Sequence, residues 1–253
     1  MPRKARTKSR SGIYHIMLRG INKQLIFEDD EDKRRFLEVL KRYKERCHFQ
    51  LYGYCLMNNH VHLLMREGDE PLSLILKRIS SSYVYWYNNK YDRFGHLFQE
   101  RFKSENVEDR AYFLTVLRYI HQNPLKAGLS PDVFDSSWTS IQEYTQKATI
   151  VDVDLALNQF SANRKTALVG FKAHMQQITN DRCLDEKVIV RISDSEIMSY
   201  MRELGISNSS VLQQLDRESR NDILRELKKL NGISIRQLSR VTGVSKSVIQ
   251  RLT

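Results

Sequence analysis

The centre of the fold is predicted from the segment Met57-Asn58-Asn59-His60-Val61-His62-Leu63-Leu64-Met65. Val61–Met65 is an apolar run of the length of a buried strand, and a second such run, Phe49–Leu56, precedes it. The turn-prone pair Asn58-Asn59 separates the two runs. We therefore expect two neighbouring strands here, with the second in the middle of a sheet.

The flanking sequence supplies further strands and helices. The expected elements are a strand at Ile13–Leu18 with an exit turn at Arg19-Gly20-Ile21-Asn22, helices at Asp29–Cys47 and Leu72–Asn89, a short strand-pair edge at Gly95–Lys103, and a helix at Arg110–Gln122 that Pro124 stops. This order predicts an α+β fold: a ferredoxin-like, RRM-like antiparallel sheet with helices on one face. We place this domain at residues 13–145, after a flexible basic arm at residues 1–12.

The pattern changes near residue 145. Residues 146–180 are expected to be a helical connector, and residues 181–253 an all-helical domain. Capping-box spacing of Ser193 with Glu196, and of Ser234 with Gln237, marks helix starts, while Gly232 and Gly243 stand where helices would end.

Residues 234–252 have the proportions of a helix-turn-helix. Their expected core is Ile235, Leu238, Val244, Val248 and Ile249. Residues 217–253 carry nine Lys or Arg against three Asp or Glu, and Lys246, Ser247, Gln250 and Arg251 would face a DNA groove. The alternative is a small helical packing module that makes no DNA contact.

Composition and charge restrict the class of protein. The chain has 253 residues, 41% of them hydrophobic, with a net charge of +11 and a pI near 9.5. The charge favours a polyanionic partner, nucleic acid before an anionic membrane surface, although a merely soluble basic protein remains an alternative. Three cysteines without metal-site spacing, no signal peptide and no apolar run near ~20 residues predict a cytoplasmic, nucleoid-associated protein outside the membrane.

His60 and His62 are the first candidate site residues. Alternate residues of a strand point to the same face, so the two imidazoles project together while Val61 points the other way. Two neutral imidazoles side by side are a metal chelate. A purely structural histidine pair is the alternative.

Tyr119 and Asn123 are the second candidate pair. They stand one helical turn apart if the helix runs through Asn123, so the phenol and an oxygen ligand share a face. A phenol has a pKa near 10 and is a weak nucleophile at pH 7. It becomes reactive when a metal polarises its target phosphate. The alternative for Tyr119 is simple core packing.

Several collinear motifs resemble the HUH family of single-tyrosine transposases, in the branch of REP-associated tyrosine transposases. The matching segments are Tyr14-His15-Ile16, Arg19-Gly20, Ile26-Phe27-Glu28-Asp29, Asn59–Met65, Gly95–Phe102, Tyr119–Leu129, and Ser136–Ser140 with Tyr144. They cover about residues 12–145.

The resemblance implies roles for particular residues. His60 and His62 would bind Mg²⁺ or Mn²⁺, Asn123 would be the third ligand in place of the Gln that many relatives carry, and Tyr119 would be the nucleophile. It also implies the sheet fold and, commonly, a homodimer. The implied reaction cleaves and rejoins single-stranded DNA near a hairpin through a 5′-phosphotyrosine.

Basic residues are candidate phosphate contacts for this DNA. They are Arg3, Lys4, Arg6, Lys8 and Arg10 of the arm, together with Arg19, Arg101 and Lys103. Tyr83, Tyr85 and Tyr87 could stack on bases or pack in the core. Two other functions stay open: a relaxase or replication initiator, and a non-catalytic DNA-binding regulator.

Overall fold

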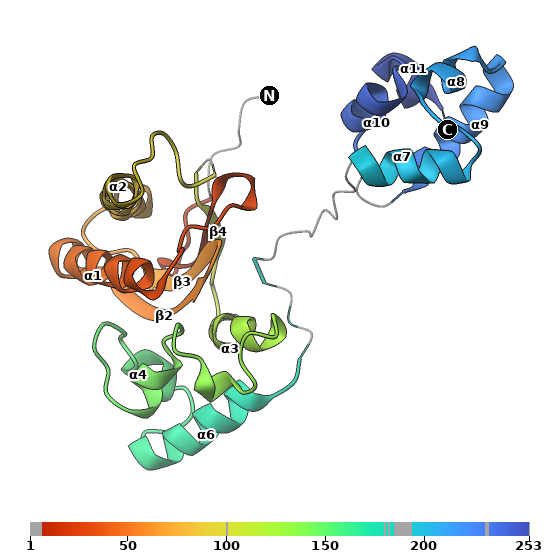
Figure 1. Cartoon of the computed structure of the whole chain (residues 1–253). Coiled ribbons are helices and arrows are strands. Elements are labelled where there is room, and N and C mark those ends of the chain that lie inside the picture. The colour runs from red at the N-terminus through yellow and green to blue at the C-terminus, as the bar shows by residue number, and fades with distance from the viewer. Residues whose placement is uncertain are drawn as a thin grey trace. The chain divides into compact units, whose positions relative to one another are not determined.

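The computed structural model describes residues 7–99, 101–179, 181, 183–184, 194–230 and 233–252. The chain forms two compact units, Met1–Asp185 and Glu186–Thr253, each with a hydrophobic core of its own. Figure 1 shows the elements of both units, which are described separately below.

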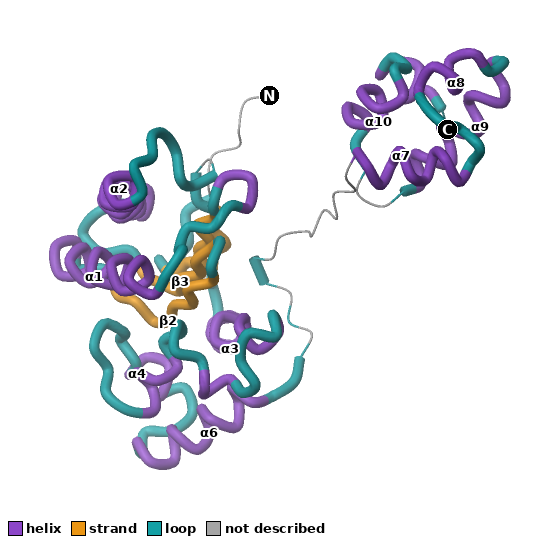
Figure 2. The backbone as a smooth tube through the Cα atoms, in the orientation of Figure 1, coloured by secondary structure: helices purple, strands orange, loops and turns teal. Residues whose placement is uncertain are grey.

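A four-stranded antiparallel sheet forms the centre of the first unit (Figure 2). Its order is β2-β3-β1-β4, with β1 at Ile13–Arg19, β2 at Gln50–Met57, β3 at His60–Arg66 and β4 at Lys103–Asn106. The strand carrying the two histidines, β3, is therefore central, as predicted. The α+β class and the ferredoxin-like strand order are confirmed, while the fourth strand begins only at Lys103, beyond most of the predicted edge at Gly95–Lys103.

Helices lie on both faces of this sheet, whereas the sequence predicted one (Figure 1). The helices α1 (Asp30–Cys47) and α2 (Leu72–Lys90) lie on one face, and α3 (Arg110–Lys126) covers the other. Gly53 permits this close approach, because a Cβ there would lie 3.0 Å from Leu117 of α3. The apolar character of the central strands is explained by burial on both faces.

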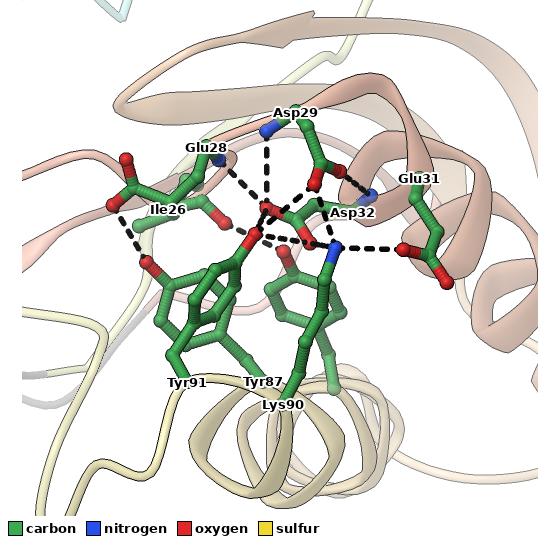
Figure 3. Close-up of polar contacts among 9 residues, drawn as sticks. Ile26, Glu28, Asp29, Glu31, Asp32, Tyr87, Lys90 and Tyr91 are labelled. Carbon is green, nitrogen blue, oxygen red and sulfur yellow. Dashed lines mark hydrogen bonds and ion pairs between the residues drawn. The ribbon is translucent and has the colours of Figure 1, made fainter.

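The start of α1 is tied to the end of α2 by a polar cluster (Figure 3). Asp29 caps α1 in a capping box with Asp32. The Lys90 ammonium lies 2.8 Å from carboxylate oxygens of Asp29, Glu31 and Asp32. The Tyr91 hydroxyl donates to Asp32, which is fully buried. This cluster fixes the two helices to each other.

Helix α3 begins at the cap residue Asp109, whose side chain accepts from the Tyr112 amide. The prediction that Pro124 stops the helix is wrong, because α3 continues to Lys126. Proline removes one backbone donor, and so near the end of the helix it sacrifices only one interior hydrogen bond. Gly128, with φ of +68°, then takes the left-handed conformation after the last turn.

The predicted connector at residues 146–180 is instead part of the first unit. Two short 3-10 turns, η1 (Ile21–Lys23) after β1 and η2 (Val133–Asp135) after α3, and the helix α4 (Ile141–Thr145) precede this segment. It forms the helices α5 (Asp154–Leu157) and α6 (Arg164–Gln176). Phe171 of α6 stacks on Tyr144 at 4.5 Å between ring centroids. Because its apolar face is buried in the same core, this segment belongs to the first domain.

The described part of the N-terminal arm is also held in place, contrary to the predicted flexibility. Ser9 is buried, and its amide donates to the Tyr14 hydroxyl. The amides of Arg10 and Ser11 donate to the Glu108 carboxylate. Arg3, Lys4 and Arg6 lie outside the described residues.

The described residues of the second unit form only helices and their connections, as predicted. Its helices are α7 (Asp194–Glu203), α8 (Ser209–Gln214), α9 (Arg217–Lys229), α10 (Ile235–Thr242) and α11 (Lys246–Arg251). Ser234 caps α10 by accepting from the Gln237 amide, and Gly243 ends it with φ of +71°, both as predicted. Ser193 and Gly232 lie outside the described residues.

The expected core of α10 and α11 is confirmed in part. Leu238, Val244 and Ile249 are buried, and Ile235 is partly buried. Val248, expected in the core, is 37% exposed, because neighbouring Ile249 takes the inward-facing position of this short helix. In the part of the chain that the structure describes, no helix is long and apolar enough to cross a membrane.

Candidate active site

The two histidines of β3 project from the sheet face that α3 covers. Their ring centroids are 5.0 Å apart, and the ring planes are nearly perpendicular. His62 is buried, His60 is half-buried, and Val61 between them is buried. The alternation of side chains along the strand thus brings both imidazoles together, as predicted.

Each of these rings has a polar partner at Nδ1. His60 Nδ1 lies 2.6 Å from the amide oxygen of Asn59, to which it donates as the Nδ1–H tautomer. His62 Nδ1 lies 3.0 Å from His15 Nε2 on β1. When one ring nitrogen of a histidine binds a metal, the N–H of the other usually donates a hydrogen bond to such a partner. Both contacts occupy Nδ1 and so leave Nε2 of each ring as the nitrogen that could bind an ion.

Burial keeps the inner histidines uncharged. Desolvation lowers the pKa of His15 to about 3. Desolvation, followed by the neighbouring His15 and His60, holds the pKa of His62 well below 6.5. A metal ligand must be a neutral imidazole, so His62 is in the required state at neutral pH.

Tyr119 of α3 lies directly against this pair. Its ring centroid is 5.6 Å from that of His62 and 5.7 Å from that of His15, in edge-on arrangements. Its side chain is 5% exposed. The Lys126 ammonium, two turns further along α3, lies 5.4 Å from the centre of the tyrosine ring. The phenol therefore lies between two buried imidazoles and a cation.

Asn123 lies one turn after Tyr119, because α3 runs through both residues. Its side-chain amide donates to the backbone oxygen of Tyr119 at 2.9 Å. This contact uses an N–H of the amide and leaves the side-chain oxygen as the atom that suits a metal.

The residues present fit a divalent ion bound by few protein ligands. Within the described ranges, no group of three or more His, Cys, Asp or Glu side chains is arranged to hold a metal. His60 and His62 would supply two nitrogens, and Asn123 one oxygen. The remaining positions would be open to oxygen ligands from water or a phosphate, which suit Mg²⁺ and Mn²⁺.

His121, in the same helix, is not part of this site. Its Nε2 lies 2.8 Å from the Ser140 hydroxyl, and its ring contacts Tyr144 edge-on. It is fully buried, and desolvation lowers its pKa to about 3. His121 therefore joins α3 to the segment that follows it.

Two of the predicted DNA contacts flank the histidines. Arg19 pairs with His60 across β1 and β3, and Lys103 pairs with Met17, which in turn pairs with His62. Directly paired residues of antiparallel strands share a face, so both cations lie on the side of the site. Lys8, Arg10 and Arg101 are exposed, as are Lys246, Ser247, Gln250 and Arg251 of the second unit.

His15 and Lys126 contact the candidate site but were not predicted from the sequence to have a function. His15 could have been found from its place on a strand, but its contact with His62 depends on the pairing of β1 with β3. Lys126 carries a clearer signal, since it stands seven residues after Tyr119 and so on the same helical face.

Comparison with known proteins finds one family model and solved structures that are similar to parts of this chain. The family model described as "Transposase IS200 like" matches residues 8–123. A structure of a REP-associated tyrosine transposase bound to a REP hairpin matches 61% of this chain and 96% of its own, with a TM-score of 0.51 and 15% identity. A putative transposase from Deinococcus radiodurans matches 44% and 89%, with a TM-score of 0.34 and 14% identity. No curated protein matches the chain.

Proposed function

From the premise that residues 8–123 of this chain belong to the family of IS200-like transposases, we propose that the protein is a metal-dependent DNA endonuclease and strand transferase. Tyr119 is its nucleophile. The observation that carries the proposal is the placement of the Tyr119 ring 5.6 Å from the ring of His62, itself paired with His60.

The reaction is a transesterification on single-stranded DNA. The Tyr119 oxygen forms a bond to the scissile phosphorus as the phenol loses its proton. The bond from phosphorus to the 3′ oxygen breaks, and that oxygen leaves as a free 3′-OH. The product is a 5′-phosphotyrosine that keeps the phosphodiester energy. A second 3′-OH can then reverse the step and join two strands without ATP.

The side chains around Tyr119 have distinct roles in this proposal. His60 and His62, with Asn123 as third ligand, hold Mg²⁺ or Mn²⁺, which when bound orients the phosphate and stabilises its charge. His15 holds the His62 ring in one orientation. Lys126 places a positive charge beside the phenol, where negative charge develops. Arg19 and Lys103 are placed to contact the flanking phosphates.

The substrate is single-stranded DNA beside a hairpin. The similar solved structure is that of a transposase bound to a REP hairpin. The net charge of +11 and the two cations beside the histidines also favour a DNA strand at this face.

The second unit adds affinity for duplex DNA or selects the site. Its α10 and α11 helices, joined through Gly243, have helix-turn-helix proportions, and the polar side chains of α11 are exposed. Deleting residues 186–253 is expected to weaken duplex binding and to leave single-strand cleavage intact. Unchanged duplex affinity would leave the second unit as a packing module.

A covalent trapping experiment tests the catalytic proposal. The full chain is incubated with end-labelled single-stranded DNA that carries a REP-like hairpin, with Mn²⁺ or Mg²⁺. We expect a protein–DNA adduct that survives denaturation, disappears with EDTA and is absent in Tyr119→Phe. The matched control is Tyr112→Phe, a half-buried tyrosine on the same helix, which should form the adduct normally.

The same experiment separates the alternatives. A non-catalytic regulator would bind the hairpin DNA without forming any adduct. A relaxase or replication initiator would form the adduct but would require a different target, such as an origin sequence, in place of the hairpin.

A further inference from the structure

The helices α1 and α2 enclose a groove that has no role in the proposed chemistry. It has a volume of about 800 Å³ and is lined by α1 residues from Arg35 to Tyr43 and α2 residues from Leu74 to Asn89. We call it the α1–α2 groove. These helices cover the sheet face opposite α3 (Figure 1). Because Tyr119 belongs to α3, the groove is separate from it.

The α1–α2 groove is positively charged. Arg35, Arg42, Lys77 and Arg78 line it, and no carboxylate does. Arg35 is paired with Glu38, and Arg78 with Glu70. Arg42 and Lys77 are exposed, and neither has an ion-pair partner among the residues that the structure describes. Two such cations, one on each helix that lines the groove, attract an anionic ligand.

Aromatic rings lie beside these cations. Tyr85 is 80% exposed at the edge of the groove. Trp86 is half-buried and held by cations on its ring, with the Arg35 guanidinium at 5.8 Å and the Lys90 ammonium at 5.2 Å. Ser81 and Ser82, which have small side chains, line the groove on α2 between Lys77 and Tyr85. Tyr83 and Tyr87 are fully buried and are excluded as stacking residues.

We propose that the α1–α2 groove binds single-stranded nucleic acid, with Arg42 and Lys77 on phosphates and Tyr85 stacked on a base. Cationic side chains along the backbone and exposed rings for the bases are the two parts of such sites. A duplex keeps its bases paired and cannot use the ring, and an acidic peptide would use the charges alone. Along α2 the lining spans about 22 Å at 1.5 Å per residue, which is long enough for a strand of several nucleotides.

The site would hold a strand away from Tyr119, so it goes beyond the proposed cleavage reaction. A strand bound there keeps the same protein on its DNA after cleavage, whichever base sequence it has, because stacking and phosphate contacts do not select bases.

The test measures binding of fluorescein-labelled (dT)12 to the full chain by anisotropy, in EDTA so that no cleavage occurs. The groove variant is Arg42→Glu with Lys77→Glu. The matched control is Arg34→Glu with Lys41→Glu, which makes the same change of charge at two exposed residues of α1 outside the groove. Thermal unfolding is compared to confirm that both variants fold.

The groove variant should bind at least about tenfold more weakly at 100 mM salt, and its slope of log affinity against log salt should fall by about 1.4, or 0.7 for each lost phosphate contact. Tyr85→Ala should weaken binding by about tenfold, and Tyr85→Phe, which keeps the ring, should not. A 5-iodouracil in the strand should crosslink to the peptide that carries Tyr85 and Trp86.

Equal losses in the groove variant and the control would overturn the proposal, as would crosslinks only elsewhere. So would a poly-glutamate peptide that binds the groove more tightly than (dT)12. Adduct formation at Tyr119 is scored separately with metal present. The groove can thus fail while the catalytic proposal stands, and the reverse.

Discussion

The two units of this chain place their candidate functional side chains in opposite environments. In the first unit, Tyr119 and His62 are 5% and 1% exposed, packed between a sheet and a helix. In the second, the four candidate DNA contacts on α11 are all exposed. A reacting group must be held in one orientation, whereas a group that contacts phosphates must reach solvent. Changes in the first unit should therefore alter both chemistry and stability, and those on α11 should alter binding alone.

Acidification should produce the largest difference in folding stability between the two units. His15 and His121 have folded pKa values of about 3, below the value near 6.5 in an unfolded chain. The unfolded chain therefore binds more protons between pH 6.5 and 3. The stability that these residues contribute is complete above pH 6.5 and is lost as the pH falls. At pH 5 the loss is about 2 kcal/mol for each histidine, or about 4 kcal/mol together.

This difference can be measured on the intact chain. All seven histidines lie in the first unit, the last being His174, and so do both tryptophans, Trp86 and Trp138. Urea unfolding followed by tryptophan fluorescence should show the loss at pH 5, while the helical signal retains a second transition from the other unit. Equal destabilisation of both units at pH 5 would show that the buried histidines of the first unit do not make it more sensitive to acid.

Loss of His15 should have the next largest effect, on the metal rather than on DNA. His15→Leu removes the partner of His62 Nδ1, and losses of this kind weaken metal binding by about 10- to 100-fold. His15→Gln, which keeps a polar group, should retain part of the affinity, and the exposed His48→Leu all of it. Mn²⁺ binding followed by electron paramagnetic resonance measures this. Full affinity in His15→Leu would show that the His15 contact only packs the core.

Substitutions on α11 should have the smallest effect. Lys246→Glu with Arg251→Glu is expected to lower the salt slope of duplex binding by about 1.8, or 0.9 for each phosphate contact, without changing stability or adduct formation. The matched control, Arg225→Glu with Lys229→Glu, changes two basic residues of α9 that are already ion-paired. A loss of adduct formation in the α11 variant would show that the second unit is needed for cleavage, and would contradict the prediction that α11 affects binding alone.

Local patterns predicted the sheet and the site best. The alternation His60-Val61-His62 placed both rings on one face, and the spacing of Tyr119 and Asn123 placed them on one side of a helix, because each depends only on neighbours in the chain. His15 was missed as a partner because its contact needs the register Met17 with His62, a pairing between strands far apart in sequence.

Non-local packing also explains the other errors. The segment 146–176 has weak patterning of its own, and its place in the first unit follows from contacts such as Phe171 on Tyr144. Pro124 was expected to stop α3, but the helix end is set by the turn at Gly128. Val248 and Ile249 are adjacent apolar residues, and only the packing of a short helix decides which is buried.

Mapping the protein–DNA bond shows whether Tyr119 is the nucleophile. The full chain is reacted with hairpin-bearing single-stranded DNA and Mn²⁺, digested with nuclease and protease, and the modified peptide is sequenced by tandem mass spectrometry. The expected result is a nucleotide joined through its 5′ phosphate to the Tyr119 oxygen. A nucleotide on any other residue, or cleaved DNA without a protein-linked nucleotide, would show that Tyr119 is not the nucleophile.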